Sequence, residues 1–220
     1  MKISNIIIIF CISLFSSQLY SQPKTSNNKL YLIKTNNKYG LTDKNGKILV
    51  EPTFDFIDSF SDGIAIFSNN GKYGYIDSTG KILVESKFNC AWKFINGIAR
   101  AGFNLEPNDP FPLLSIGLLD KNGKWILEPK YNWIEDFHEG LAAVNIGCYA
   151  ARNKQYTGMD SYIENWSLTS CNGKWGYIDK TGKLVIDTRF DDVTNFENGK
   201  ANVKIGEQRY TINLKGEYID

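Results

Sequence analysis

The stretch GKWGYIDKTGKLVID, residues 173–187, contains the pattern that organises the whole chain. Two short runs rich in aromatic and β-branched residues flank the turn sequence Asp179-Lys180-Thr181-Gly182. Glycine in the fourth place of such a turn can adopt a positive φ, so this stretch predicts a β-hairpin with a type I turn followed by a glycine bulge. The same turn chemistry recurs at residues 43–46 and 120–123.

Glycines recur along the chain in three series with a basic period of 34 residues. The turn glycines are separated by 34, 43, 59 and 34 residues, and they are Gly46, Gly80, Gly123, Gly182 and Gly216. The other two series share the first three separations, and they are Gly40, Gly74, Gly117 and Gly176, and Gly63, Gly97, Gly140 and Gly199. A fixed period of this length is the signature of a repeat architecture, in which one copy here carries 9 extra residues and another carries 25.

Each repeat is expected to contribute three strands. A strand such as 63–67 precedes the aromatic-Gly strand, and the strand after the turn glycine follows it. Segments that begin with proline, such as 52–60, connect the units, because proline cannot donate to a β-ladder. Five units result, and they run over roughly 30–51, 63–85, 97–128, 140–187 and 199–220.

This organisation predicts an all-β chain that is a tandem repeat of five three-stranded antiparallel meanders in an open curved array. Both ends of the array hold whole units, whereas an interlocked ring would share a split unit between the termini. A closed propeller-like or barrel-like arrangement is the alternative. The content of 42% hydrophobic and 14% aromatic residues is enough for a core, and 19 glycines favour turns over helices.

The repeat resembles a known family. The segments KYGL at 38–41, KYGYID at 72–77 and KWGYID at 174–179 look like the opening of the WG-containing repeat, also called the KWG repeat. The resemblance covers essentially all of residues 30–220. One copy has the literal Trp-Gly pair, Ile116 replaces the aromatic residue in the third copy, and the last copy reads Arg209-Tyr210. The resemblance implies an interaction or structural module without a common catalytic residue.

The N-terminus predicts export. Lys2 gives a positive start, residues 6–15 form an apolar run too short to span a bilayer as a mature helix, and Ser21 is a small residue at a cleavage point. We therefore predict a signal peptide at 1–21, a flexible tail at 22–29 and a repeat domain at 30–220. Such a protein would be periplasmic, cell-surface or secreted, with no membrane span in the mature chain.

The two insertions are the candidate functional region. They lie near 103–112 and 148–171, each between the first and second strands of adjacent units, so they should leave the array at the same edge. Aromatic and arginine side chains are typical of binding hot spots. The candidate binding residues are therefore Phe111, Tyr149, Arg152, Tyr156, Tyr162 and Trp166. Alternatively, the long insertion folds back on its own aromatic residues and covers an edge.

The cysteines concern the same insertion. Cys148 and Cys171 flank it at the neck of a hairpin, where cross-strand partners are close, so we predict a disulfide in an oxidising compartment. Cys90 occupies a connector position and is expected to be a packed thiol. No Cys/His spacing indicates a metal site, because His138 is the single histidine, and no cofactor is expected.

Composition and motifs disfavour catalysis and nucleic-acid binding. The net charge is +1, and removal of residues 1–21 would leave 24 basic and 24 acidic residues. His138 occupies a turn position, and turn or connector roles explain the carboxylates. We expect a non-enzymatic module that binds another protein. The alternative is a carbohydrate-binding protein or glycosidase acting on cell-surface glycans, with exposed Trp92, Trp133 and Trp166 as stacking platforms.

Overall fold

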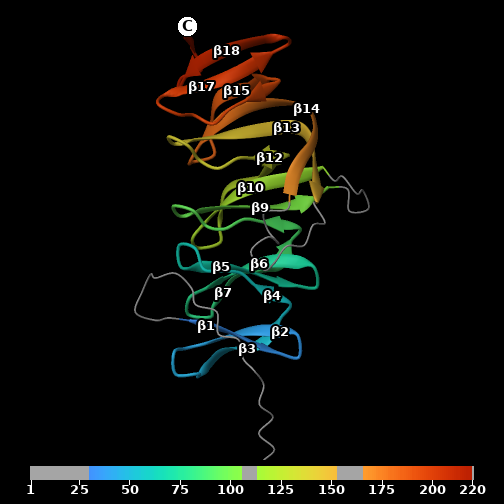
Figure 1. Cartoon of the computed structure of the whole chain (residues 1–220), viewed down its shortest axis with the longest axis vertical. Helices are drawn as coiled ribbons and strands as arrows, with labels where there is room; N and C mark the ends of the chain where they lie inside the picture. Colours follow the sequence, from blue (N-terminus) through green and yellow to red (C-terminus); the bar gives the residue numbers. More distant parts are fainter. Residues whose placement is uncertain (1–29, 106–112, 153–165, 220) are drawn as a thin grey trace, which may run out of the picture.

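The computed structural model describes residues 30–105, 113–152 and 166–219, and of residues 148–152 and 166–172 it describes the backbone only. The predicted signal peptide and tail lie outside the described residues. Five small antiparallel sheets are stacked into a column, with the N-terminal unit at one end and the C-terminal unit at the other (Figure 1). Among the described residues there is no helix, and hence none that could cross a membrane.

Each sheet consists of strands that follow one another in sequence, and we number the units 1 to 5. Unit 1 has three strands and the later units have four. The strands of units 1 to 3 are β1 (Tyr31–Thr35), β2 (Lys38–Thr42), β3 (Ile48–Phe54); β4 (Phe56–Ile57), β5 (Ile64–Asn69), β6 (Lys72–Asp77), β7 (Ile82–Phe88); and β8 (Cys90–Ala91), β9 (Ile98–Asn104), β10 (Leu114–Asp120), β11 (Trp125–Tyr131). Those of units 4 and 5 are β12 (Trp133–Ile134), β13 (Leu141–Arg152), β14 (Trp166–Asp179), β15 (Leu184–Phe190); and β16 (Asp192–Val193), β17 (Lys200–Ile205), β18 (Gln208–Asn213), β19 (Tyr218–Ile219).

The prediction of an all-β tandem array is confirmed, and the connectors add a feature that the sequence did not reveal. Each connector contributes a two-residue strand that pairs with the first strand of the next unit, as β12 does with β13. A two-residue turn then leads into that first strand. In all four connectors the first residue of this turn has a positive φ and the second is glycine. The first residues are Asp62, Asn96, Glu139 and Asn198.

The hairpin turn predicted at 179–182 has the expected geometry. Gly182 has a φ of 81° and its N–H donates to the Asp179 carbonyl at 2.9 Å. The Asp179 carboxylate accepts from the Thr181 N–H at 2.9 Å and from the Lys183 N–H at 3.1 Å. The pKa of Asp179 lies below its usual range, chiefly because the Thr181 hydroxyl donates to the carboxylate. The turn therefore stabilises itself through its own aspartate.

Stacking places the hairpin turn of one unit on the last strand of the preceding unit, for example the β14–β15 turn on β11. A Cβ at Gly182 would lie 2.8 Å from the Leu127 Cβ, and one at Gly216 would lie 3.0 Å from the Ile186 Cγ2. Tyrosine hydroxyls also reach the next connector: Tyr177 donates to the Thr194 carbonyl at 2.8 Å. A large cluster of buried side chains runs through units 2 to 5, and a smaller one joins units 1 and 2.

Candidate functional site

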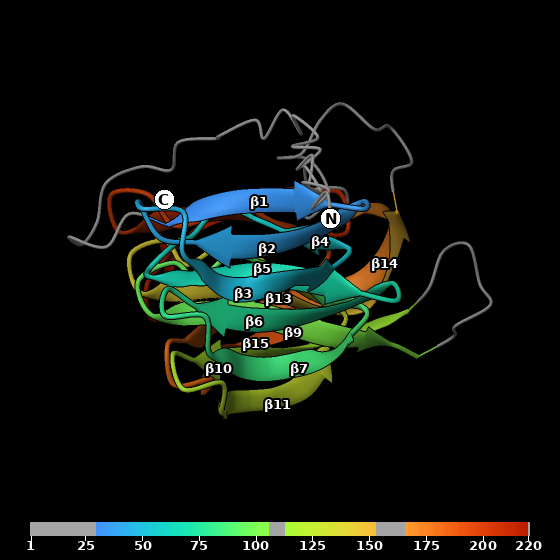
Figure 2. The ribbon, with the colours of Figure 1, turned by 90° about the horizontal axis from the view of Figure 1, so that it is seen from below.

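In units 2 to 5 the strand that follows the connector turn (β5, β9, β13 or β17) runs from that turn to the opposite edge of the column. The described strand ends that flank the two insertions, those of β9 and β10 in unit 3 and of β13 and β14 in unit 4, lie on the same side of the column (Figure 2). In unit 4 the two strands that hold the insertion are 12 and 14 residues long, whereas β5 and β6 have six residues each. We call this side of units 3 to 5 the insertion edge.

The extended part of the β13–β14 hairpin forms an arm beyond the stacked sheets. Its register pairs Cys148 with Cys171, Tyr149 with Ser170, and Arg152 with Trp166. Three predicted binding residues, Tyr149, Arg152 and Trp166, therefore belong to the strands of the arm. Arg152 and Trp166 are cross-strand partners. The other three, Phe111, Tyr156 and Tyr162, lie outside the described residues.

The neck of the arm brings the two predicted disulfide partners face to face along the backbone. Directly opposed residues in an antiparallel pair have Cα atoms roughly 4.5–5.5 Å apart. That separation is within the range of about 4.4–6.8 Å that a disulfide spans. The register of Cys148 and Cys171 is therefore compatible with a bond, which stays a prediction. Cys90 is fully buried and its pKa is raised by burial, as expected for a packed thiol.

Connector side chains fix the hairpin ends at the insertion edge. The Asn132 side-chain oxygen accepts from the Gly147 N–H at 2.6 Å, and the Asp191 carboxylate accepts from the Gly206 N–H at 2.7 Å. Lys174 also donates to Asp191, and this contact is the main reason that the pKa of Asp191 is lowered. The bonds to Gly147 and Gly206 join a connector residue to the hairpin of the following unit, and the Lys174 contact joins the connector to the preceding hairpin, so the base of the edge is held in register.

Apolar side chains are exposed along the same edge. Leu105 directly follows β9, Ile146 lies in β13 at the base of the arm, and Ile205 ends β17, with exposed fractions of 55%, 45% and 37%. At the position of Ile146, units 1 and 2 have the polar residues Thr35 and Asn69. Among the described residues, the exposed apolar side chains at this edge therefore belong to units 3, 4 and 5.

Two of the tryptophans proposed as exposed stacking platforms are buried, so that expectation was wrong. Trp92 and Trp133 are 8% and 6% exposed, and their rings meet edge to face with centroids 5.8 Å apart. The Arg100 guanidinium lies 5.1 Å from the Trp92 ring centre, and the Trp133 N–H donates to Glu135 at 2.8 Å. Both residues lie in the connectors, whose polar neighbours conceal their burial in the sequence.

The residues considered for catalysis lie in the connectors. His138 is exposed in a connector turn, where its N–H donates to the Leu141 carbonyl at 2.8 Å. Asp136 forms an ion pair with Arg100 at 2.6 Å. In the part of the chain that the structure describes, no group of three His, Cys, Asp or Glu residues could hold a metal ion.

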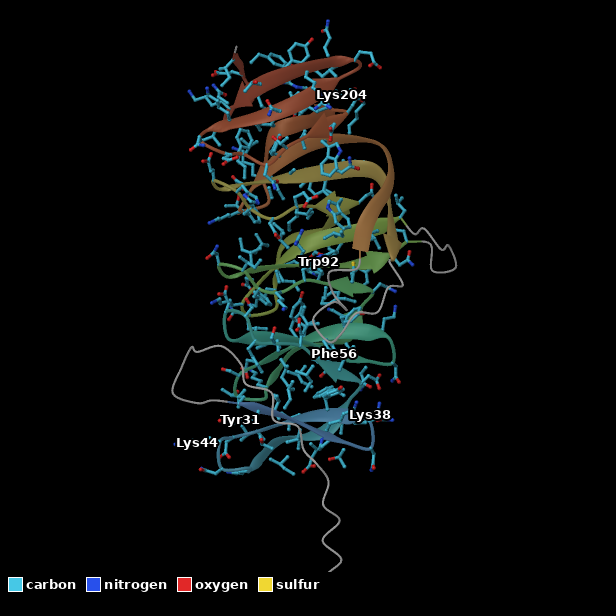
Figure 3. All side chains as sticks on the ribbon, viewed as in Figure 1. Tyr31, Lys38, Lys44, Phe56, Trp92 and Lys204 are labelled. Carbon is cyan, nitrogen blue, oxygen red and sulfur yellow. The ribbon has the colours of Figure 1, made fainter. Side chains whose placement is uncertain are left out.

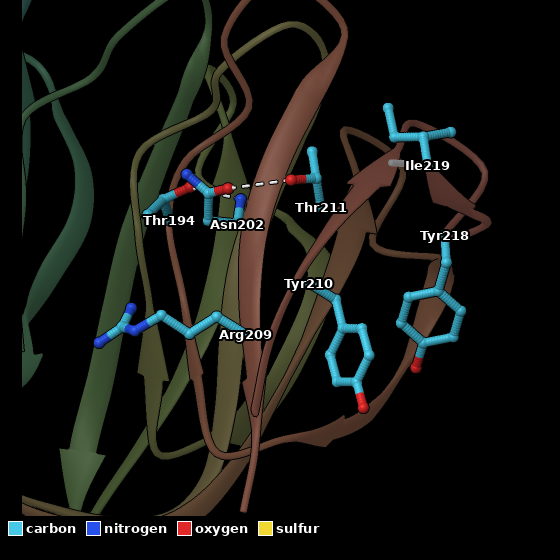
Figure 4. Close-up of a pocket in the computed structure, with 7 residues that line it drawn as sticks. All are labelled: Thr194, Asn202, Arg209, Tyr210, Thr211, Tyr218 and Ile219. Atoms are coloured by element: carbon cyan, nitrogen blue, oxygen red, sulfur yellow. Dashed lines mark hydrogen bonds between the residues drawn. The ribbon is translucent and has the colours of Figure 1, made fainter. Parts of the chain in front are cut away.

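Unit 5 carries a cavity that sequence reasoning missed. It has a volume of about 560 Å³, and its walls come from Thr194 of the connector and from β17, β18 and β19 (Figure 4). Tyr210 and Tyr218 lie on one side with ring centroids 5.1 Å apart, and the Thr211 hydroxyl donates to the Asn202 side-chain oxygen at 3.3 Å. The sequence feature that could have indicated it is Tyr210, which stands where units 1 to 4 all have glycine.

Comparison with known families now identifies the repeat. The model described as "WG containing repeat" matches residues 39–73, 73–104, 116–147 and 175–208. The chain belongs to the WG-containing repeat family. A search of curated proteins finds no match. Each match begins at the second strand of a WG repeat, and the gaps between the later matches contain the two insertions. The insertions are therefore additions to the repeat.

Proposed function

We propose that this WG-repeat protein is an exported, non-enzymatic binding module whose insertion edge contacts another protein. The observation that carries the proposal is the coincidence on one edge of two insertions with the exposed side chains of Leu105, Ile146 and Ile205. Apolar side chains grouped at one edge are typical of protein contact surfaces. Tyrosine, tryptophan and arginine, which the arm carries, dominate the binding energy of many such surfaces.

Three further observations support the parts of this proposal. The apolar run after Lys2 favours export, and the cysteine pair at the neck of the arm fits an oxidising compartment. The carboxylates that could serve chemistry, Glu135 and Asp136, are each bonded to a neighbouring side chain. These contacts favour a structural role for the two carboxylates.

The test is quantitative capture from envelope extract, followed by cross-linking to map the contact. Replacing residues 150–169 by an Asn-Gly turn, as in the β5–β6 hairpin, should abolish capture, and Ile146→Asp should weaken it at least tenfold. Leu214→Asp, at another exposed apolar position, is the matched control and should bind normally. Capture that survives both insertion-edge variants, or cross-links that map elsewhere, would refute the proposal.

Carbohydrate binding remains a second candidate because of the unit 5 cavity. Tyr210 and Tyr218 are exposed aromatic rings beside the polar side chains of Arg209 and Asn202. Aromatic faces next to hydrogen-bonding groups can bind sugars. A glycan array probed with the protein and with Tyr218→Ala decides the matter. Loss of a specific glycan signal in the variant would favour this candidate, and an array without signal would leave protein binding as the function.

A further inference from the structure

A second cavity lies between units 3 and 4, at the edge of the column opposite the insertions. Its volume is about 470 Å³. The connectors before units 3 and 4 form its walls through residues 93–100 and 135–140, and Lys180 reaches it from the β14–β15 turn. This position is an interruption of a bonding pattern that the neighbouring junctions share.

At those neighbouring junctions, an acidic side chain of one connector turn caps the glycine of the next. The Asp62 carboxylate accepts from the Gly97 N–H at 2.6 Å, and Lys121 lies 3.8 Å from the same carboxylate oxygen. One junction further on than the cavity, the Glu139 carboxylate accepts from the Gly199 N–H at 2.8 Å. A carboxylate that accepts from the glycine N–H is thus common to both neighbouring junctions, and at the Asp62 junction a lysine lies beside it.

The junction with the cavity lacks this carboxylate. Asn96 stands in the place of Asp62 and Glu139, and it makes no hydrogen bond to Gly140 in the described part of the chain. Lys180 corresponds to Lys121, and among the described residues it has no ion-pair partner. The Gly140 N–H and the Lys180 ammonium are therefore the counterparts of two donors that are bonded to Asp62 one unit earlier.

The other charged groups of the cavity are already engaged. Lys93 lies 3.5 Å from Asp58, and Arg100 donates to Asp136 and, at 2.5 Å, to the Ile134 carbonyl. Glu135 accepts from Trp133, and Glu139 caps Gly199. Apolar surface lies next to the unpaired donors, because Ile95 is more than half exposed and replaces Ser61, whose hydroxyl donates to the Phe94 carbonyl.

We infer that this cavity binds the carboxylate side chain of an extended acidic peptide from a partner protein. The carboxylate would accept from the Gly140 N–H and pair with Lys180, which reproduces the bonds of Asp62, and charge-assisted bonds of this kind are the strong ones. Ile95, Ile98 and Phe137 would contact the apolar residues that flank it. A volume of this size suits a short peptide segment better than a single ion.

The test is an NMR titration of the ¹⁵N-labelled protein with N-acetyl-Leu-Glu-Leu-amide. The Gly140 amide resonance should shift on saturation, and the corresponding glutamine peptide should bind at least tenfold more weakly. Asn96→Asp supplies the missing carboxylate from within the chain and should abolish binding. Lys180→Gln should weaken binding about tenfold, whereas Lys121→Gln, the same turn position one unit earlier, should leave it unchanged.

Three results would overturn the inference. They are equal binding of the glutamate and glutamine peptides, unchanged affinity in Asn96→Asp, and tighter binding of trigalacturonate, an acidic sugar, than of the peptide. The site is independent of the insertion edge, so these outcomes are separate from the test of the proposed function.

Discussion

At the scale of single residues, Gly176 lies where the backbones of the paired strands β14 and β15 come into close contact. A Cβ at this position would lie 2.4 Å from the Ile186 carbonyl oxygen, and β15 is bulged where it passes. Real Cβ atoms do not approach a backbone oxygen so closely, and the obstacle is backbone that cannot rotate away. The same close approach of a neighbouring backbone oxygen recurs at Gly40, Gly74 and Gly117.

Gly176→Ala should therefore lower the free energy of unfolding by about 3 kcal/mol, the usual scale of overpacking a rigid site. Urea denaturation measures it. The matched control is Tyr210→Ala, because Tyr210 pairs with Val203 as Gly176 pairs with Val144, and its side chain is partly exposed. That variant should lose less than about 1 kcal/mol. Equal losses in the two variants would show that the close contact between the two backbones is not the reason that glycine is required here.

Asp58 gives the stability a pH dependence of its own. Its side chain is almost completely buried, accepts from the Ser59 N–H at 2.6 Å and lies 3.5 Å from the Lys93 ammonium. Desolvation outweighs these contacts and raises the pKa of Asp58 in the folded state. Because the native state then holds its proton to a higher pH than the unfolded chain does, this residue lowers stability as the pH rises from about 4.

Asp58→Asn removes that titration while keeping an oxygen that can accept from Ser59. The variant should gain stability relative to the wild type as the pH is raised from 4 to 7, measured by urea denaturation at several pH values. Asp187→Asn, at an exposed position in β15, is the control for loss of a charge. A stability difference between Asp58→Asn and the wild type that stays constant with pH would contradict the raised pKa.

At the scale of elements, the β13–β14 arm extends far beyond the sheet that supports it. Only a two-stranded ribbon continues past Ile146, and an isolated pair of strands is marginally stable in water. A covalent link at its neck would hold the two strands in register. Cys148 and Cys171 are paired at the base of the arm, where such a link would restrict the arm most.

We predict that the exported protein contains the Cys148–Cys171 disulfide. Closing a loop of this length should stabilise the fold by about 3 kcal/mol in the chain-entropy model. Peptide mapping by mass spectrometry without reduction should find the linked pair and a free Cys90. The double variant Cys148→Ser/Cys171→Ser should unfold at lower denaturant concentration, while Cys148→Ser alone should leave Cys171 open to alkylation. Two free thiols in protein from an oxidising compartment would exclude the bond.

Sequence reasoning succeeded where one residue type fixes a local geometry. The Asp-x-x-Gly turns and the 34-residue period were sufficient to predict the hairpins and their stacking. The connectors were harder, because β12 and its counterparts have two residues each, too few to show any periodicity. Whether Trp92 and Trp133 face inward depends on pairing with the next unit, and so their burial could not be predicted. The cavity near Lys180 was also hidden, since it arises from residues distant in sequence.

At the scale of the whole molecule, the column is a one-dimensional array in which each unit contacts its neighbours (Figure 3). The small cluster that joins units 1 and 2 is distinct from the large cluster that runs through units 2 to 5. In such an array stability is close to a sum of unit and interface contributions. The effect of a core substitution should therefore depend on where in the column it lies.

Leu41 and Leu118 provide the comparison, because both follow the glycine of the second strand and both are fully buried, in units 1 and 3 respectively. Truncation of either to alanine should remove about 3 kcal/mol locally. Leu41→Ala belongs to the small cluster, so hydrogen exchange should accelerate in units 1 and 2 and stay slow in units 4 and 5. Leu118→Ala lies in the large cluster and should accelerate exchange in units 2 to 5 together. The same exchange pattern in both variants would mean that the column unfolds as a single cooperative unit, and the division into two clusters would then have no energetic meaning.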